Sequence, residues 1–149
     1  NQMKAFRIMP AVAEYADFCA MAQELNLGAR DLILTNEYIY NPTIATLNLG
    51  CQTCFQEKYG AGEPTDVMVD AILAAAAKTD CKRIVAIGGG TVIDIAKVLA
   101  VSDGEGVDEL YDKAPNLEKK RELIIIPTTC GTGSEVTQVC VITQTPENY

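Results

Sequence analysis

Three consecutive glycines, Gly88–Gly90, stand between an apolar run and a segment of helical character, an arrangement that suits the binding of an anion. The run before them, Ile84–Ile87, has the composition of a strand buried on both faces. Glycines leave no side chain where the backbone turns sharply or approaches a ligand. Thr91 and Asp94 have the spacing of a capping box, which predicts that a helix starts there. The first-turn amides of that helix would point at the glycines and favour a phosphate.

The glycine run departs from the two standard phosphate-binding signatures. No Gly-Lys-Ser/Thr follows it, as a P-loop requires, and Ile93 stands where the ordinary dinucleotide fingerprint has its third glycine. The usual ribose-binding carboxylate about twenty residues later is also missing. The nearest strand-end candidate, Asn36–Glu37, comes well before the glycines. A tight strand-to-helix turn without a ligand therefore remains an alternative for this pattern alone.

A second loop rich in hydroxyl groups reads PTTCGTGSEVT and runs from Pro127 to Thr137, directly after the apolar run Glu122–Ile126. Its side chains offer many hydrogen-bond donors, and Thr132 and Glu135 again have capping-box spacing. Such a loop can also satisfy its own polar groups. Because both loops follow predicted strands, they should meet at one edge of a sheet, and this favours a ligand site.

The alternation of strands and helices along the chain predicts a parallel sheet with helices on both faces, an α/β Rossmann-like fold. The polar segment Ser102–Leu117 is predicted to be a surface excursion. The other predicted strands are Lys4–Ile8, Asp31–Thr35, a short one at Phe55, and Val139–Thr143. The other predicted helices are Ala11–Leu27, ended by Gly28, one opening at Asn41–Pro42 and running towards Leu49, and one capped by Thr65–Asp66 that runs through Ala77.

Composition and charge limit the classes of protein to which this chain can belong. The chain has 149 residues, of which 48% are hydrophobic and 21% charged, typical of a single globular domain. Its net charge of −8 argues against nucleic acid or an anionic membrane as a partner. The apolar runs are too short to span a membrane and no signal peptide opens the chain, so we expect a cytoplasmic location.

The six cysteines include one CxxC pair, Cys51 and Cys54, at a spacing used in metal and redox sites. No second CxxC pair accompanies it, and the chain contains no histidine. We therefore expect reduced, partly buried thiols and no metal site.

The two loops together closely resemble the signatures of the iron-containing (group III) alcohol dehydrogenase family. GGGTVIDIAK, ending at Lys97, is similar to GGGSxxDxAK, and PTTCGTGSEVT is similar to PTTxGTGSE. Thr91 in place of serine keeps the hydroxyl group, and Cys130 replaces a small residue. Further matches in ILTNE and FQEKYGAGEP resemble most the branch that oxidises 4-hydroxybutyrate. The resemblance extends from about Asp31 to about Val141.

The resemblance implies a dehydroquinate synthase-like N-terminal domain that binds a nicotinamide dinucleotide. The resemblance implies that Gly88, Gly89, Gly90 and Thr91 hold the pyrophosphate, and that Thr128, Thr129 and Thr132 contact the cofactor from the other side. Asp94 and Lys97 belong to the first signature. Asp94 is expected to cap the helix at the cofactor site, and Lys97 to have a supporting role. Asn36 occupies the position where many relatives have an aspartate that binds the adenosine ribose and repels a 2′-phosphate. The amide of Asn36 can still bond the ribose, but it lacks the negative charge that repels a 2′-phosphate. NAD is expected as the cofactor, and NADP remains an alternative.

The resemblance also implies what lies outside residues 1–149. In the family an aspartate and histidines of a helical second domain hold a divalent metal ion, which is expected to be iron here. We therefore expect this chain to be the dinucleotide-binding domain alone, with no catalytic or metal-ligating residue and no activity of its own. The expected substrate of the full-length enzyme is a small hydroxy acid or alcohol, and a homo-oligomer is expected. A glycerol dehydrogenase-like or dehydroquinate synthase-like relative, or a stand-alone nucleotide-binding module, remains an alternative.

Overall fold

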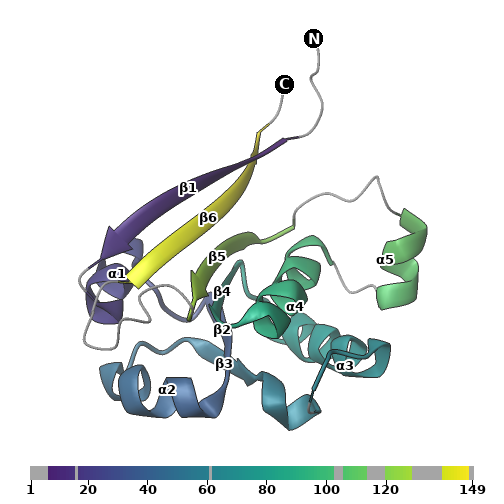
Figure 1. Cartoon of the computed structure of the whole chain (residues 1–149), viewed down its shortest axis with the longest axis horizontal. Helices are drawn as coiled ribbons and strands as arrows, with labels where there is room; N and C mark the ends of the chain where they lie inside the picture. The colour runs from purple at the N-terminus through teal and green to yellow at the C-terminus, as the bar shows by residue number, and fades with distance from the viewer. Residues whose placement is uncertain are drawn as a thin grey trace.

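The computed structural model describes residues 7–15, 17–60, 62–102, 106–113, 120–128 and 139–147. Six strands form one sheet in the order β1-β6-β5-β4-β2-β3 (Figure 1). The strands are β1 (Arg7–Tyr15), β2 (Asp31–Thr35), β3 (Gln52–Phe55), β4 (Arg83–Gly88), β5 (Glu122–Pro127) and β6 (Val139–Glu147). The helices are α1 (Phe18–Leu25), α2 (Glu37–Thr43), α3 (Asp66–Ala77), α4 (Gly90–Val101) and α5 (Val107–Lys113), with 3-10 turns η1 (Ala45–Leu47) and η2 (Gln56–Tyr59).

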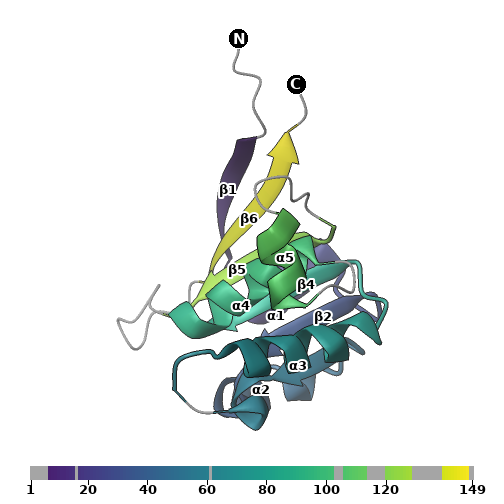
Figure 2. The same cartoon turned by 90° about the vertical axis from the view of Figure 1, so that its right-hand side faces the viewer.

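The parallel part of the sheet consists of β3, β2, β4 and β5. Helices α1 and α2 lie over one face of these strands, and α3, α4 and α5 lie over the other (Figures 1 and 2). The α/β fold with helices on both faces is therefore confirmed. No helix within the described residues is long and apolar enough to cross a membrane.

Alternate residues of the buried strands divide the apolar interior into two cores, as the two-residue period of a strand requires. On β2, for example, Leu32 and Leu34 face α3 and α4, whereas Ile33 faces α1 and α2. The same alternation continues along β4 and β5. All five residues of β2 are buried, because this strand lies between β4 and β3 and is covered by helices on both faces.

The predicted helix Ala11–Leu27 is wrong in its first part. Residues up to Tyr15 belong to β1, which pairs antiparallel with β6 along its whole length. Pairing with a strand distant in sequence outweighs the helical spacing of the apolar residues. Helix α1 starts after Asp17, whose carboxylate accepts from the Ala20 N–H at 2.9 Å, and it ends at Asn26 in the left-handed conformation, before Gly28. Of the predicted strand Lys4–Ile8, only its last two residues lie within the described part, in β1.

Two further predictions need correction. The second helix starts at Glu37, directly after β2, and not at Asn41–Pro42, so Pro42 lies inside a short helix and not in its first turn. The polar segment after Ser102 contains α5, because Val107 and Leu110 are buried against α3 and α4. The Asp70 carboxylate also accepts from the Val107 N–H at 2.7 Å. Helix α3 starts as predicted, with the Thr65 hydroxyl accepting from the Met68 N–H.

The amino ends of β2 and β4 are joined by a partly buried ion pair. Arg83 Nε lies 2.7 Å from Asp31 Oδ1, and Arg83 Nη2 lies 3.1 Å from Asp31 Oδ2. The same Nη2 donates to the Leu25 carbonyl, and the Gly28 N–H donates to Asp31. The pair therefore ties the end of α1 to the two central strands.

Replacing Arg83 with methionine is expected to lower the free energy of unfolding by about 2–4 kcal/mol, because the buried Asp31 carboxylate loses its partner. Lys82→Met is the matched control, since Lys82 lies 3.9 Å from Asp80 in an exposed pair. It should cost less than about 0.5 kcal/mol. Urea unfolding followed by circular dichroism measures the free energy of unfolding of both variants. Equal losses would show that the Arg83–Asp31 pair stabilises the fold no more than the exposed pair does.

Candidate functional site

The turn from β4 into α4 brings the glycine run to the carboxyl edge of the sheet. A Cβ atom added to Gly88 would lie 3.0 Å from both Cβ and Cγ2 of Val92, so the strand end packs directly on the helix. By contrast, Gly89 and Gly90 are exposed, and an added Cβ would have no atom within 4 Å. The missing side chain of Gly88 therefore allows β4 to pack on α4, whereas Gly89 and Gly90 leave open space at the edge of the sheet.

The predicted capping box of Thr91 and Asp94 is wrong. The N-cap is Gly89, whose carbonyl accepts from the Ile93 N–H at 3.1 Å, and the helix already begins at Gly90. Thr91 is therefore the second residue of α4, and Asp94 lies exposed beyond its first turn. Glycine permits the strand to turn into a helix at once, so the helix starts before the hydroxyl group. As a result, no side chain of the described residues caps the first-turn amides.

Asn36 and the glycine turn lie at the point where the chain connections diverge. β2 leads into α2 on one face of the sheet, whereas its neighbour β4 leads into α4 on the other. In open parallel sheets ligands bind at such a switch point. The buried Thr35 hydroxyl donates to the Ile87 carbonyl at 2.7 Å, just beyond the last paired residues of the two strands. Thr35 was not among the residues predicted at the site, although a hydroxyl at the end of an apolar strand was a visible signal.

A carboxylate that the sequence analysis missed lies beside Asn36. Asn36 Nδ2 donates to Glu57 Oε1 at 2.9 Å and to Gln56 Oε1 at 3.2 Å. Glu57 Oε2 accepts from the Glu37 N–H at 2.8 Å. Slight burial acts to raise the pKa of Glu57, but these hydrogen bonds and the Lys58 charge together lower it below its usual value. Glu57 is therefore charged at neutral pH.

Thr128 follows β5 and lies next to the glycine turn. Its N–H donates to the Gly88 carbonyl at 3.1 Å, and its side chain is exposed. Thr129 and Thr132 lie outside the described residues, as does the predicted capping pair of Thr132 with Glu135. Of the predicted site residues, the structure thus brings Thr128, Gly88 and Thr91 to one edge, with Asn36 on the adjacent strand.

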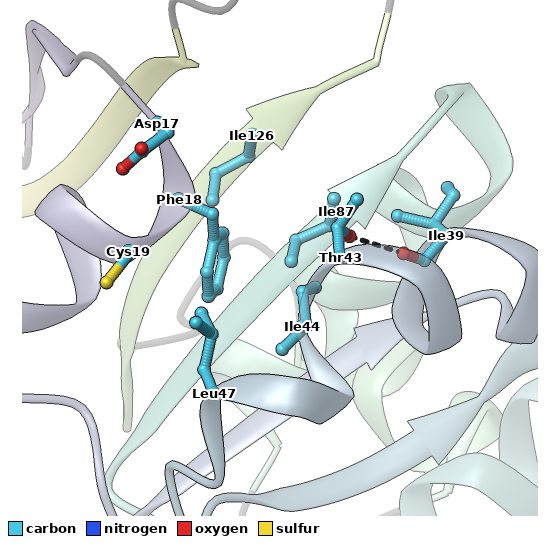
Figure 3. Close-up of a pocket in the computed structure, with 9 residues that line it drawn as sticks. All are labelled: Asp17, Phe18, Cys19, Ile39, Thr43, Ile44, Leu47, Ile87 and Ile126. Atoms are coloured by element: carbon cyan, nitrogen blue, oxygen red, sulfur yellow. Dashed lines mark hydrogen bonds between the residues drawn. The ribbon is translucent and has the colours of Figure 1, made fainter.

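An apolar cavity of about 490 Å³ lies beside this edge (Figure 3). Ile87 and Ile126, which line it, are the last buried apolar side chains of β4 and β5 before their loops. The other residues that line it come from α1, α2 and η1 and from the capping residues of the two helices: Asp17, Phe18, Cys19, Ile39, Thr43, Ile44 and Leu47. The Thr43 hydroxyl donates to the Ile39 carbonyl, so the lining stays mainly apolar. This size and lining are typical of pockets for small molecules.

The CxxC pair lies on opposite faces of the sheet. Cys51 packs beside the core under α1 and α2, whereas Cys54 is buried in the core under α3 and α4. Both are free thiols, and burial is the main cause that raises the pKa of each to about 11. Among the described residues, no group of three His, Cys, Asp or Glu side chains is placed to hold a metal ion.

The fold and this edge define a Rossmann-like α/β domain with an open helix N-terminus at the switch point of its sheet. The chain belongs to the iron-containing alcohol dehydrogenase family, whose model matches residues 13–149. The resemblance found in the two loop motifs is thereby confirmed.

Two curated relatives and one solved structure illustrate the match. The chain is 43% identical over 139 residues to the 4-hydroxybutyrate dehydrogenase of Clostridium kluyveri, covering 93% of this chain and 38% of that protein. It is 36% identical over 131 residues to the long-chain-alcohol dehydrogenase 1 of Geobacillus thermodenitrificans, covering 78% and 32%. The chain thus spans well under half the length of these relatives.

The structural match is to a sulfoacetaldehyde reductase from Bifidobacterium kashiwanohense, solved in complex with NAD+. The TM-score is 0.57 at 24% identity, and the match covers 78% of this chain and 32% of that one. This likeness confirms the expected dehydroquinate synthase-like fold.

Iodoacetamide is expected to label Cys51 and Cys54 about a hundredfold more slowly in the folded chain than in urea at pH 8, because a pKa of about 11 against 9.0 lowers the thiolate fraction by that factor. Labelling of both should accelerate as the pH rises towards 11. Tandem mass spectrometry of the tryptic peptide 31–58, which contains both cysteines, measures each site. Rapid labelling of the folded protein, or a disulfide between the two, would contradict this account.

Proposed function

We propose that this chain binds NAD at the carboxyl edge of its sheet and is the dinucleotide-binding part of a metal-dependent alcohol dehydrogenase. The observation that carries the proposal is the N-terminus of α4, where first-turn amides without a side-chain cap adjoin the exposed Gly89 and Gly90. A helix end of this kind attracts a phosphate by its unpaired N–H groups and its dipole. Membership of the family and the NAD+ complex of the sulfoacetaldehyde reductase support the same ligand.

The residues at this edge fit a dinucleotide. Gly88, Gly89, Gly90 and Thr91 would bind the pyrophosphate, because the turn leaves room for close approach and the Thr91 hydroxyl adds a donor. Asn36 would accept a hydrogen bond from the adenosine ribose at the end of β2. Thr128 would contact the cofactor from the β5 side.

Three of the predicted cofactor-binding residues have weaker support. Thr129 and Thr132 lie outside the described residues and remain predictions. Asp94 also stays a prediction as a cofactor contact, since its role as a helix cap is wrong.

The complete reaction proposed is the oxidation of a small hydroxy acid, with 4-hydroxybutyrate converted to succinic semialdehyde. The 43% identity to a 4-hydroxybutyrate dehydrogenase supports this substrate class. When bound, the dinucleotide would supply the hydride acceptor, and a divalent metal would supply polarisation of the substrate hydroxyl. The part of this role that belongs to the present chain is to bind and orient the dinucleotide. The chain contains no histidine, so a histidine-containing metal site would come from further polypeptide.

The 149-residue chain is expected to show no oxidation of 4-hydroxybutyrate with NAD, even with added ferrous or zinc ion, because the metal-binding residues are supplied elsewhere. Formation of NADH followed by absorbance measures turnover directly. Turnover above that of the buffer would contradict this assignment.

Replacing Gly89 with aspartate is expected to strengthen the fold and abolish the anion site at the same time. An N-cap carboxylate would bond the open amides, raising the free energy of unfolding by about 0.5–1 kcal/mol. The same carboxylate would compete with the pyrophosphate, so the Kd for NADH should rise about tenfold or more. Fluorescence titration with NADH and urea unfolding measure the two effects.

Gly89→Ala is the matched control for this experiment, because it adds a Cβ in open space without capping the helix. The difference between the two variants isolates the effect of the carboxylate. Unchanged NADH binding by Gly89→Asp would place the dinucleotide away from α4 and overturn the proposed function.

A further inference from the structure

The carboxyl ends of β2 and β3 place Asn36 and Glu57 side by side. Thr35 pairs with Phe55 at the last position of the two strands, so the next residues of both leave the sheet together. Parallel strands lie about 4.8 Å apart, and side chains leaving adjacent ends can therefore share one ligand. The hydrogen bond of 2.9 Å between Asn36 Nδ2 and Glu57 Oε1 shows that these two side chains do meet.

The hydrogen bonds of Asn36 leave its carbonyl oxygen available. Both N–H groups of its amide have acceptors, Glu57 Oε1 and Gln56 Oε1. Although Asn36 is the N-cap residue of α2, its side chain makes no capping bond. Glu57 Oε2 accepts from the Glu37 N–H in its place. Oδ1 of Asn36 has no partner among the described residues and is the group that can accept from a ribose hydroxyl.

Glu57 places a negative charge beside that oxygen, because its Oε1 accepts a hydrogen bond from the nitrogen of the same amide group. The nearby charges are Glu37 and Lys58, which pair with each other at 3.6 Å. Lys58 Nζ also lies 5.4 Å from the centre of the Phe55 ring. The three charged side chains therefore sum to one negative charge, held by Glu57. In dinucleotide-binding domains a carboxylate at such a strand end bonds the ribose and disfavours a 2′-phosphate.

From this geometry we propose that Glu57 is a specificity-determining residue, which supplies across β3 the negative charge that Asn36 lacks and so favours NAD over NADP. This inference rests on the proposed function, because it requires the dinucleotide to lie at the same edge. Asn36 provides the acceptor for the ribose, and Glu57 both orients Asn36 and repels a 2′-phosphate. The recognition of the ribose is thereby divided between two neighbouring strands.

The test is a set of fluorescence titrations with NADH and NADPH on the 149-residue chain. Wild type should bind NADH more tightly. Glu57→Gln should reduce the ratio of the NADPH Kd to the NADH Kd about tenfold, mainly by tighter NADPH binding. The difference should shrink in high salt, because Glu57 is exposed.

Two further variants separate this role from a general effect of charge or folding. The double variant Asn36→Asp with Glu57→Gln exchanges the amide and the carboxylate between the two positions and keeps a hydrogen bond between them. Its preference for NADH over NADPH should therefore return. Asp80→Asn removes one negative charge at the opposite edge, and asparagine suits its left-handed φ of 52°. It should leave the ratio unchanged.

The outcomes distinguish the two proposals. An unchanged ratio in Glu57→Gln, with both coenzymes still bound, would make Glu57 a helix cap only and overturn this inference, leaving the proposed function intact. The same shift in Asp80→Asn would attribute the effect to net charge and also overturn it. A wild-type chain that binds neither coenzyme would overturn both proposals.

Discussion

The close contact between Gly88 and Val92 is the constraint on which the edge of this domain depends. The absence of a side chain at Gly88 lets β4 pass into α4 within a single residue. Val92, Ile95 and Leu99 are then buried under the sheet, which fixes the direction of the helix. A Cβ at residue 88 would push Val92 away. The glycine that allows the core to pack therefore also fixes where the first-turn amides of α4 lie.

Two backbone carbonyl groups near this turn accept hydrogen bonds from other parts of the chain. The Ile87 carbonyl accepts from the Thr35 hydroxyl, and the Gly88 carbonyl accepts from the Thr128 N–H. Both oxygens therefore already accept hydrogen bonds, whereas the first-turn amides of α4 have no side-chain cap among the described residues. At the other end of β4, Arg83 is bonded to Asp31, and the strand is fixed at both ends. An anion would therefore meet donors held by the sheet itself.

The sequence predicted those parts of the fold whose signals are local. The strands predicted at Asp31–Thr35 and Glu122–Ile126 each contain a continuous apolar run, and Thr65 caps α3 as its spacing indicates. Most of β1 was predicted as helix, because its partner β6 lies near the other end of the chain and no local pattern reports such a pairing. The start of α4 was misplaced for a different reason: the turn chemistry of glycine outweighed a capping box that was present in the sequence but unused.

The relation between Asn36 and Glu57 shows why a site residue cannot be judged from its own position alone. Read along the chain, an amide at the end of β2 indicates a lost charge and a weaker preference between coenzymes. The fold brings Glu57 to the same place from the end of β3, where its oxygens accept from both Asn36 and the Glu37 backbone. A carboxylate held in this way has the same sign and nearly the same position as one on β2. On the proposed reading, Glu57 at the end of β3 supplies the edge with the negative charge that the amide at the end of β2 lacks.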